Sequence, residues 1–169
     1  MDPTTAQIVV DILKHAVPLS ADQIWIYNQR KEIPPTRGFF VVVGYVSSKP
    51  YGASRKQVAD SSGLVEKCSV VMQEMLSIKV TSADYSTVQQ LPMIIAALSS
   101  TYAREMQEKW GFKLATVPLS VPETSELEGS GILYQFTITV NALRGYTKEG
   151  NIDYYDQFST ETSSEKGIV

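Results

Sequence analysis

The sequence predicts a single α+β domain, with a mainly antiparallel sheet that two main helices pack against and a long projecting loop or hairpin. Three observations lead to this prediction. Apolar residues recur at helical spacing in two segments, and they alternate with polar residues in two others. The chain has 169 residues, of which 43% are hydrophobic and 20% charged, so it can bury one core and would hardly supply two.

The first predicted element is a helix that ends before Pro18. Asp2 and Pro3 are residue types that favour the start of a helix. The apolar side chains then recur at intervals of three and four residues, namely Ile8, Val9, Ile12, Leu13, Ala16 and Val17. This spacing predicts a helix that packs on the core by one stripe.

Two strands are expected next. Residues 23–28 suit a short strand, and a proline-containing connection at residues 32–38 leads to residues 39–46, which are apolar at nearly every position. Such a strand has both faces covered, either in the middle of a sheet or at a subunit contact.

The regular pattern stops over residues 47–63, which are rich in serine, glycine and charge. Structureless segments longer than ~12–15 residues are uncommon in compact domains and are usually functional, binding or disordered. We therefore expect a long loop here.

Apolar and polar residues alternate again over residues 68–81, which predicts a long strand with one face partly exposed to solvent. Glu74 interrupts its apolar face. Cys68 is the only cysteine of the chain, so an internal disulfide and a cysteine-based zinc site are excluded. We expect Cys68 to be a small buried hydrophobe rather than a nucleophile.

A long helix is predicted after this strand, with Asp84 or Ser86 as its cap and Gly111 at its end. Its apolar stripe is formed by Leu91, Ile95, Leu98, Tyr102 and Met106. Pro92 lies within the pattern, so the main helix either begins near Leu91 or is kinked there.

Further strands complete the expected sheet. Residues 113–117 form a short one, and residues 132–142 alternate most regularly, with one face for the core and one polar face. Residues 152–158 are a candidate for a last edge strand. Residues 159–169 have the composition of a solvated tail.

Motifs for catalysis are absent from the sequence. It contains no P-loop, dinucleotide-binding fingerprint or nucleophile elbow. His15, the single histidine, is expected on the surface of the first helix. The acid pair Asp153 and Asp156 and the pair Glu105 and Glu108 lack neighbours that would complete a metal site. We expect no catalytic residue, no cofactor and no metal, and no enzymatic activity.

The charge balance also limits the partners. The formal net charge is −3, so any contact with nucleic acid or an acidic surface must be local. The N-terminal residues include an acid and lack a long apolar run, unlike a signal peptide or a membrane span. We expect no membrane contact.

The order of the elements carries a family resemblance. It consists of the IWIYN segment, the apolar strand, the helix that ends in EKWGF, and EGSGILYQFTITVNALRGY followed by IDYYDQF. In this order the chain resembles the neck and tail terminator proteins of tailed bacteriophages, over roughly residues 4–158. The resemblance implies a structural virion protein, assembled in the host cytoplasm, that forms a ring, usually hexameric in this family. Such a ring ends the tail tube and joins it to the head connector.

The resemblance suggests partners and a role for the basic segment. The partners are other copies of the chain, neck or head-connector proteins, the tail tube protein, and DNA that passes through the lumen without sequence-specific binding. Residues 47–63 are expected to project to a neighbouring subunit or ring, as a loop or hairpin arm. Lys49, Arg55 and Lys56 then meet an acidic partner surface or the passing DNA. A solvated loop without a partner is the simpler alternative.

The resemblance also suggests domain boundaries, and two other kinds of function remain as alternatives. Residues 1–158 form the terminator-like domain, and residues 159–169 are a polar tail held by a neighbouring subunit. A nucleic-acid-binding module is one alternative, since Tyr134 and Phe136 stack bases if their face is exposed. A small-ligand-binding domain or enzyme is another, and it needs a concave pocket with convergent polar groups.

Overall fold

The computed structural model describes residues 2–20, 22–27, 38–60, 63–115, 120–128 and 131–151. The elements in chain order are α1 (Thr5–Ala16), β1 (Ile24–Ile26), β2 (Phe40–Asp60), β3 (Gly63–Ser82), α2 (Ser86–Leu98), α3 (Thr101–Trp110), β4 (Phe112–Leu114), β5 (Glu126–Glu128) and β6 (Gly131–Asn151). The strand order is β1-β2-β3-β6-β4, with β5 paired to β6. Among these described strands, only the β1–β2 pair is parallel. The predicted α+β class is confirmed.

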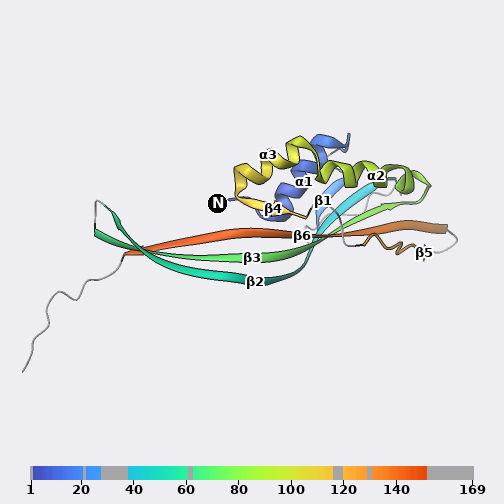
Figure 1. The fold of residues 1–169 in the computed structure, drawn as a ribbon. Helices are drawn as coiled ribbons and strands as arrows, with labels where there is room; N and C mark the ends of the chain where they lie inside the picture. Colours follow the sequence, from blue (N-terminus) through green and yellow to red (C-terminus); the bar gives the residue numbers. More distant parts are fainter. Residues whose placement is uncertain are drawn as a thin grey trace, which may run out of the picture.

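The helices lie together on one face of the sheet, whereas β2, β3 and β6 continue well beyond them (Figure 1). The core lies where helices and sheet overlap. Val43, Ile78 and Ile138 are in register across the three long strands, and all are fully buried. Each buried side chain of this size stabilises the fold by about 1.5–3 kcal/mol relative to exposure.

The long helix predicted up to Gly111 is two helices, so three helices rather than two main ones pack on the sheet. Pro92 lies inside α2, which begins at Ser86 and not near Leu91. The chain breaks instead at Ser99 and Ser100, where the Ser100 hydroxyl accepts a 3.1 Å hydrogen bond from the Ala103 amide and starts α3. Gly111 ends α3 as predicted, with φ at 61° in the left-handed region that favours glycine.

The loop or hairpin predicted over residues 47–63 is a hairpin of β2 and β3, and the structureless loop is wrong for most of its length. Residues 47–60 continue β2 and pair with β3, with register shifts between Tyr45 and Ser47 and between Pro50 and Gly52. Every side chain from residue 45 to residue 58 is exposed. The alternation used to recognise strands arises from burial of one face, so an uncovered strand does not show it.

We define the arm as the part of these strands that leaves the helices, residues 45–60, 63–73 and 145–151. Cys68 lies on the arm and is exposed, which corrects the expectation that it is buried. Its face of β3 is the one that buries Leu76 and Ile78 closer to the helices, but no helix reaches this far out. The strand candidate at residues 152–158 and the tail at residues 159–169 lie outside the described residues.

Candidate interaction surface on the arm

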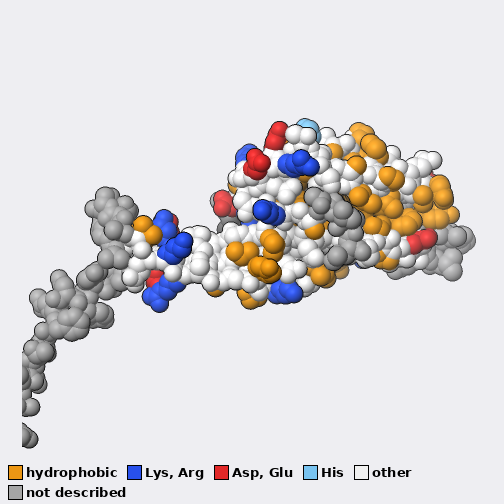
Figure 2. All heavy atoms as spheres, viewed as in Figure 1, with side chains coloured by type: hydrophobic (Ala, Val, Ile, Leu, Met, Phe, Trp, Pro, Cys, Tyr) orange, Lys and Arg blue, Asp and Glu red, His pale blue; other side chains and the backbone are white. Residues whose placement is uncertain are grey.

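The arm exposes large apolar side chains on a sheet without a core of its own. These are Tyr45, Val46, Tyr51, Val58, Val71 and Tyr146. Figure 2 shows the arm as a narrow extension on which Lys and Arg side chains gather near the outer end. Strands need a hydrophobic face packed on something, or helices above them, for independent stability. The exposed apolar surface of the arm is therefore a candidate for contact with another protein.

Both edges of the arm are open. β1 pairs with β2 only opposite Val41–Val43, and β4 pairs with β6 only opposite residues 142–144. Beyond these points neither outer edge has a partner strand among the described residues. Pro50, which lacks an amide donor, and the two register shifts interrupt the β2 edge. Such features limit unspecific pairing of exposed edges.

The predicted cations all lie on the arm and are exposed, but they do not share one face. Lys49 is opposite Gln73 and Lys56 is opposite Lys67, so these two lysines share a face of the sheet. Arg55 points to the other face and forms an ion pair with Glu66. The three residues are therefore not a single basic patch.

Other ion pairs on the arm reduce its positive charge further. Nζ of Lys67 lies 2.6 Å from Oε1 of Glu149. Both side chains are well exposed, so this pair contributes little stability. Its main effect is on the electrostatic potential, because each acid offsets a nearby cation.

A polar cluster lies at the root of the arm, where the three strands leave the helices. The Tyr146 hydroxyl donates a 2.7 Å hydrogen bond to Oε1 of Glu74, which is only 2% exposed. Nη1 of Arg144 donates a 2.7 Å hydrogen bond to the carbonyl oxygen of Pro3, just before α1. Burial, followed by the hydrogen bond to Glu74, raises the pKa of both Tyr45 and Tyr146 above the ordinary value. The sequence signalled this cluster only through Glu74, which interrupts an apolar face.

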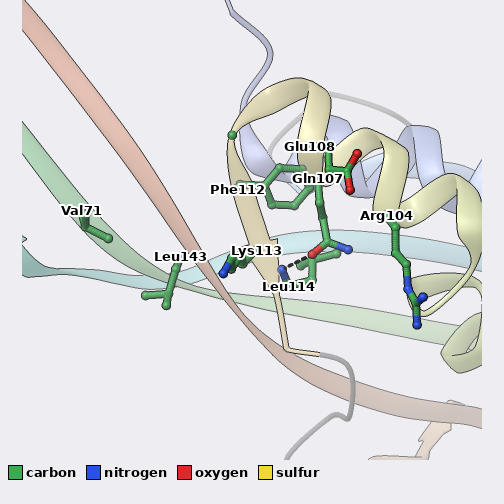
Figure 3. Close-up of a pocket in the computed structure, with 9 residues that line it drawn as sticks. Val71, Arg104, Gln107, Glu108, Phe112, Lys113, Leu114 and Leu143 are labelled. Carbon is green, nitrogen blue, oxygen red and sulfur yellow. Dashed lines mark hydrogen bonds between the residues drawn. The ribbon is translucent and has the colours of Figure 1, made fainter.

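A groove with a volume of about 640 Å³ lies beside the root, along β4 (Figure 3). Val71 and Leu143 line it from the face of the sheet that is turned away from the helices, Phe112–Leu114 from β4, and Arg104, Gln107 and Glu108 from the last turns of α3. Oε1 of Gln107 accepts a 2.8 Å hydrogen bond from the Leu114 amide and so holds α3 against β4. We call this the α3–β4 groove. The alternation of the sequence gave no sign of it.

The aromatic side chains proposed to stack bases are partly covered. Tyr134 and Phe136 are half-buried, and Tyr134 meets Tyr85 edge to face at 6.2 Å between ring centroids. Phe136 is bridged to Glu123 in the segment that precedes β5. Tyr134 and Phe136 themselves offer little open ring surface, which weakens the stacking alternative.

His15, the single histidine of the chain, is the first candidate for a metal ligand. His15 is exposed and stacks on Tyr102 at 3.8 Å, as a surface helix residue. In the described part of the chain, no three His, Cys, Asp or Glu side chains come together in a way that could hold a metal ion. Within the same residues, no helix is long and apolar enough to cross a membrane.

The fold and its surface define the class of protein as an α+β domain with an extended three-stranded arm. Comparison with protein-family models and with curated proteins finds no match to the sequence. We therefore infer the function from the residues themselves and from the arm.

Proposed function

We propose that this protein is a structural component of a tailed-bacteriophage virion, which forms a ring at the head-proximal end of the tail. The ring terminates the tail tube and joins it to the head connector. One observation supports the proposal in addition to the resemblance of the sequence: within the described residues, both faces of the arm are uncovered and both of its edges lack a partner strand. A chain that builds such an arm needs neighbours to cover it.

A second copy of the chain is a suitable neighbour. β2 and β6 both run antiparallel to β3, so they run parallel to each other on the two edges of the arm. When arms point the same way, the β2 edge of one copy can pair with the β6 edge of the next. This contact joins two different surfaces, and such head-to-tail contacts form a closed ring when the rotation between copies closes.

The charge of the arm is consistent with a ring through which DNA passes without binding tightly. Glu66 and Glu149 accompany Arg55 and Lys67, and the whole chain has a net charge of −3. Affinity for the DNA backbone grows with each phosphate that a cation neutralises. A lumen with few uncompensated cations lets DNA pass, while Lys49 and Lys56 remain available for an acidic surface of a neighbouring ring.

The test is the mass of the purified protein over a concentration series, measured by light scattering, with electron microscopy of any large species. We expect a closed ring of about six copies, alone or on the ends of added tail tubes. A protein that stays monomeric and does not bind added tail tubes contradicts the proposal. Oligonucleotide binding that weakens as salt is added would favour the nucleic-acid alternative.

A pair of variants locates the contact. Val46→Arg places a charge on the exposed start of the arm, and we expect it to block assembly while the circular dichroism spectrum stays unchanged. Met93→Arg is the matched control, because Met93 is equally exposed, at 53% against 55%, but lies on α2. Equal assembly of both variants would place the contact elsewhere than the arm.

A further inference from the structure

We propose that the α3–β4 groove binds residues 152–158 (IDYYDQF) of a neighbouring copy, so that each subunit is anchored by aromatic side chains of the next. The inference rests on the proposed self-association, yet it concerns a different surface from the edges of the arm. The two can therefore fail separately.

The groove has an apolar floor and a mainly basic rim. Val71 is 37% exposed, and Leu143 lies beside it on the sheet. Arg104 and Lys113 supply two positive charges to the lining, against one negative charge from Glu108. The volume of about 640 Å³ lies within the range of ~300–1,000 Å³ typical of ligand sites, and it has room for more than one aromatic side chain.

The polar groups of the groove favour a peptide over a small polar substrate. Gln107, whose amide points toward β4, already bonds the Leu114 amide through Oε1 and the Ala103 carbonyl through Nε2. Arg104 and Lys113 are exposed at the rim. No set of buried polar groups among the described lining residues converges on one point, which a small-molecule site uses to fix its ligand.

Residues 152–158 have the complementary chemistry. They carry the apolar and aromatic side chains Ile152, Tyr154, Tyr155 and Phe158 within seven positions. Asp153 and Asp156 add two negative charges that suit the basic rim. Large aromatic anchors seated in apolar pockets, with charges at the rim, are the usual source of binding energy between proteins.

The geometry favours a segment that comes from another copy. β6 ends at Asn151, opposite Val65, whereas the groove lies at Leu143. Eight residues of strand separate these positions, a distance of roughly 26 Å at ~3.3 Å per residue. To reach its own groove the chain must reverse, and Tyr154 and Tyr155 follow too closely for that. Residues 159–167 could reach, but they contain no large apolar side chain.

Disulfide trapping tests the inference directly, because Cys68 is the only cysteine to remove. In a Cys68→Ser background, protein with Lys113→Cys is mixed with protein with Tyr155→Cys and oxidised mildly. We expect a disulfide between two copies. Gln89→Cys on α2, exposed and away from the groove, is the control for chance collisions. If rings form but the Lys113→Cys and Tyr155→Cys proteins do not cross-link, the inference is wrong and the proposed ring stands.

The chain with both Lys113→Cys and Tyr155→Cys separates the two origins of the segment. Bonds between copies give a ladder of covalent oligomers, as the inference requires. A bond within one copy leaves the mass of a monomer, and this outcome refutes docking between copies.

A binding measurement covers the case in which the protein stays monomeric. A fluorescent peptide of residues 150–160 is titrated with the full chain, and its polarisation is followed. We expect saturable binding that Val71→Arg weakens about tenfold or more, the effect of losing one apolar contact, while Met93→Arg leaves it unchanged. Peptide binding by a protein that stays monomeric, even with added tail tubes, supports the groove and contradicts the ring. A protein that forms no ring on tail tubes and does not bind the peptide contradicts both.

Discussion

The Tyr146 hydroxyl and Oε1 of Glu74 are 2.7 Å apart, and their hydrogen bond joins β6 to β3 where the arm leaves the helices. Buried carboxyl groups are stable only when hydrogen-bonded, so this contact removes a large penalty. Arg144 adds a tie to the carbonyl of Pro3, and its guanidinium lies 5.3 Å from the ring centre of Tyr146. The root cluster thus connects the arm to the start of α1.

Removing the hydroxyl in Tyr146→Phe should lower the free energy of unfolding by about 1.5 kcal/mol, the lower end of the range for hydrogen bonds to charged groups, because Tyr146 is partly exposed. Urea denaturation measures the change. Tyr51→Phe is the control, since Tyr51 is also an exposed tyrosine of the arm but makes no hydrogen bond within the described structure. Equal losses in both variants would show that the bond to Glu74 contributes nothing.

The raised pKa values at the root predict sensitivity to alkali. Tyr45 and Tyr146 bind their protons more tightly in the folded chain than at the ordinary pKa of 10.0, through burial and Glu74. Their contribution to stability is therefore complete below about pH 10 and is lost as the pH rises toward the folded values. We expect the urea midpoint to fall between about pH 10 and pH 12, where the unfolded chain loses these protons and the folded chain still holds them.

A double variant identifies the groups responsible for the alkaline loss. Tyr45→Phe with Tyr146→Phe removes both phenols, so its urea midpoint should change less over the same pH interval. Tyr51→Phe should behave like the unmodified protein. A double variant that loses stability as steeply as the unmodified chain would assign the effect to other groups.

The sequence predicted the part of the sheet that the helices cover and residues 68–73 of the arm, and it failed on the rest of the arm. Leu76, Ile78 and Val80 were expected on the core face of one strand and Ile138 and Val140 on that of another, and all are buried. On the arm no face is buried, so β2 shows no alternation. What defines this strand is its hydrogen bonding to β3, which a single sequence does not display.

The interaction surface was predictable only in part, for the same reason. Lys49, Arg55 and Lys56, the predicted contact residues, are exposed, but on a strand Arg55 points to the opposite face from the two lysines instead of gathering with them in one loop. Glu74 was visible as an interruption, whereas its partner Tyr146 is 72 positions away in the sequence. Without the pairing of β3 with β6, nothing links the two.

At Gly44, in the sheet, there is no room for a larger side chain. A Cβ atom at this position would lie 2.9 Å from Oγ of Ser77, its register partner on β3, and 3.5 Å from Cβ of Tyr27. Gly44→Ala should therefore lower the free energy of unfolding by about 1–3 kcal/mol, as overpacking does. Adding Ser77→Ala removes the close oxygen and should recover much of the loss. An unchanged stability in Gly44→Ala would mean that the Ser77 hydroxyl rotates away at no cost.

The stability of the chain in acid should depend on Asp84, just before α2. Its Oδ1 accepts hydrogen bonds from the Ser82 hydroxyl at 2.6 Å and from the Ser86 amide at 2.9 Å. These bonds lower the pKa of Asp84 from 3.8 to about 2, so the folded chain holds the ionised form. The stability that they add is present above the ordinary pKa and is lost as the pH falls through about 2.

Asp84→Asn keeps an oxygen acceptor in the same place but removes the charge that the N-terminus of α2 favours. At neutral pH the variant should therefore unfold at a lower urea concentration than the unmodified chain. The difference should shrink as the pH is lowered toward about 2, because Asp84 then loses its charge as well. Asp11→Asn, an exposed acid within α1, controls for the change in net charge. A difference that stays constant down to this pH would show that the Asp84 charge does not stabilise the helix start.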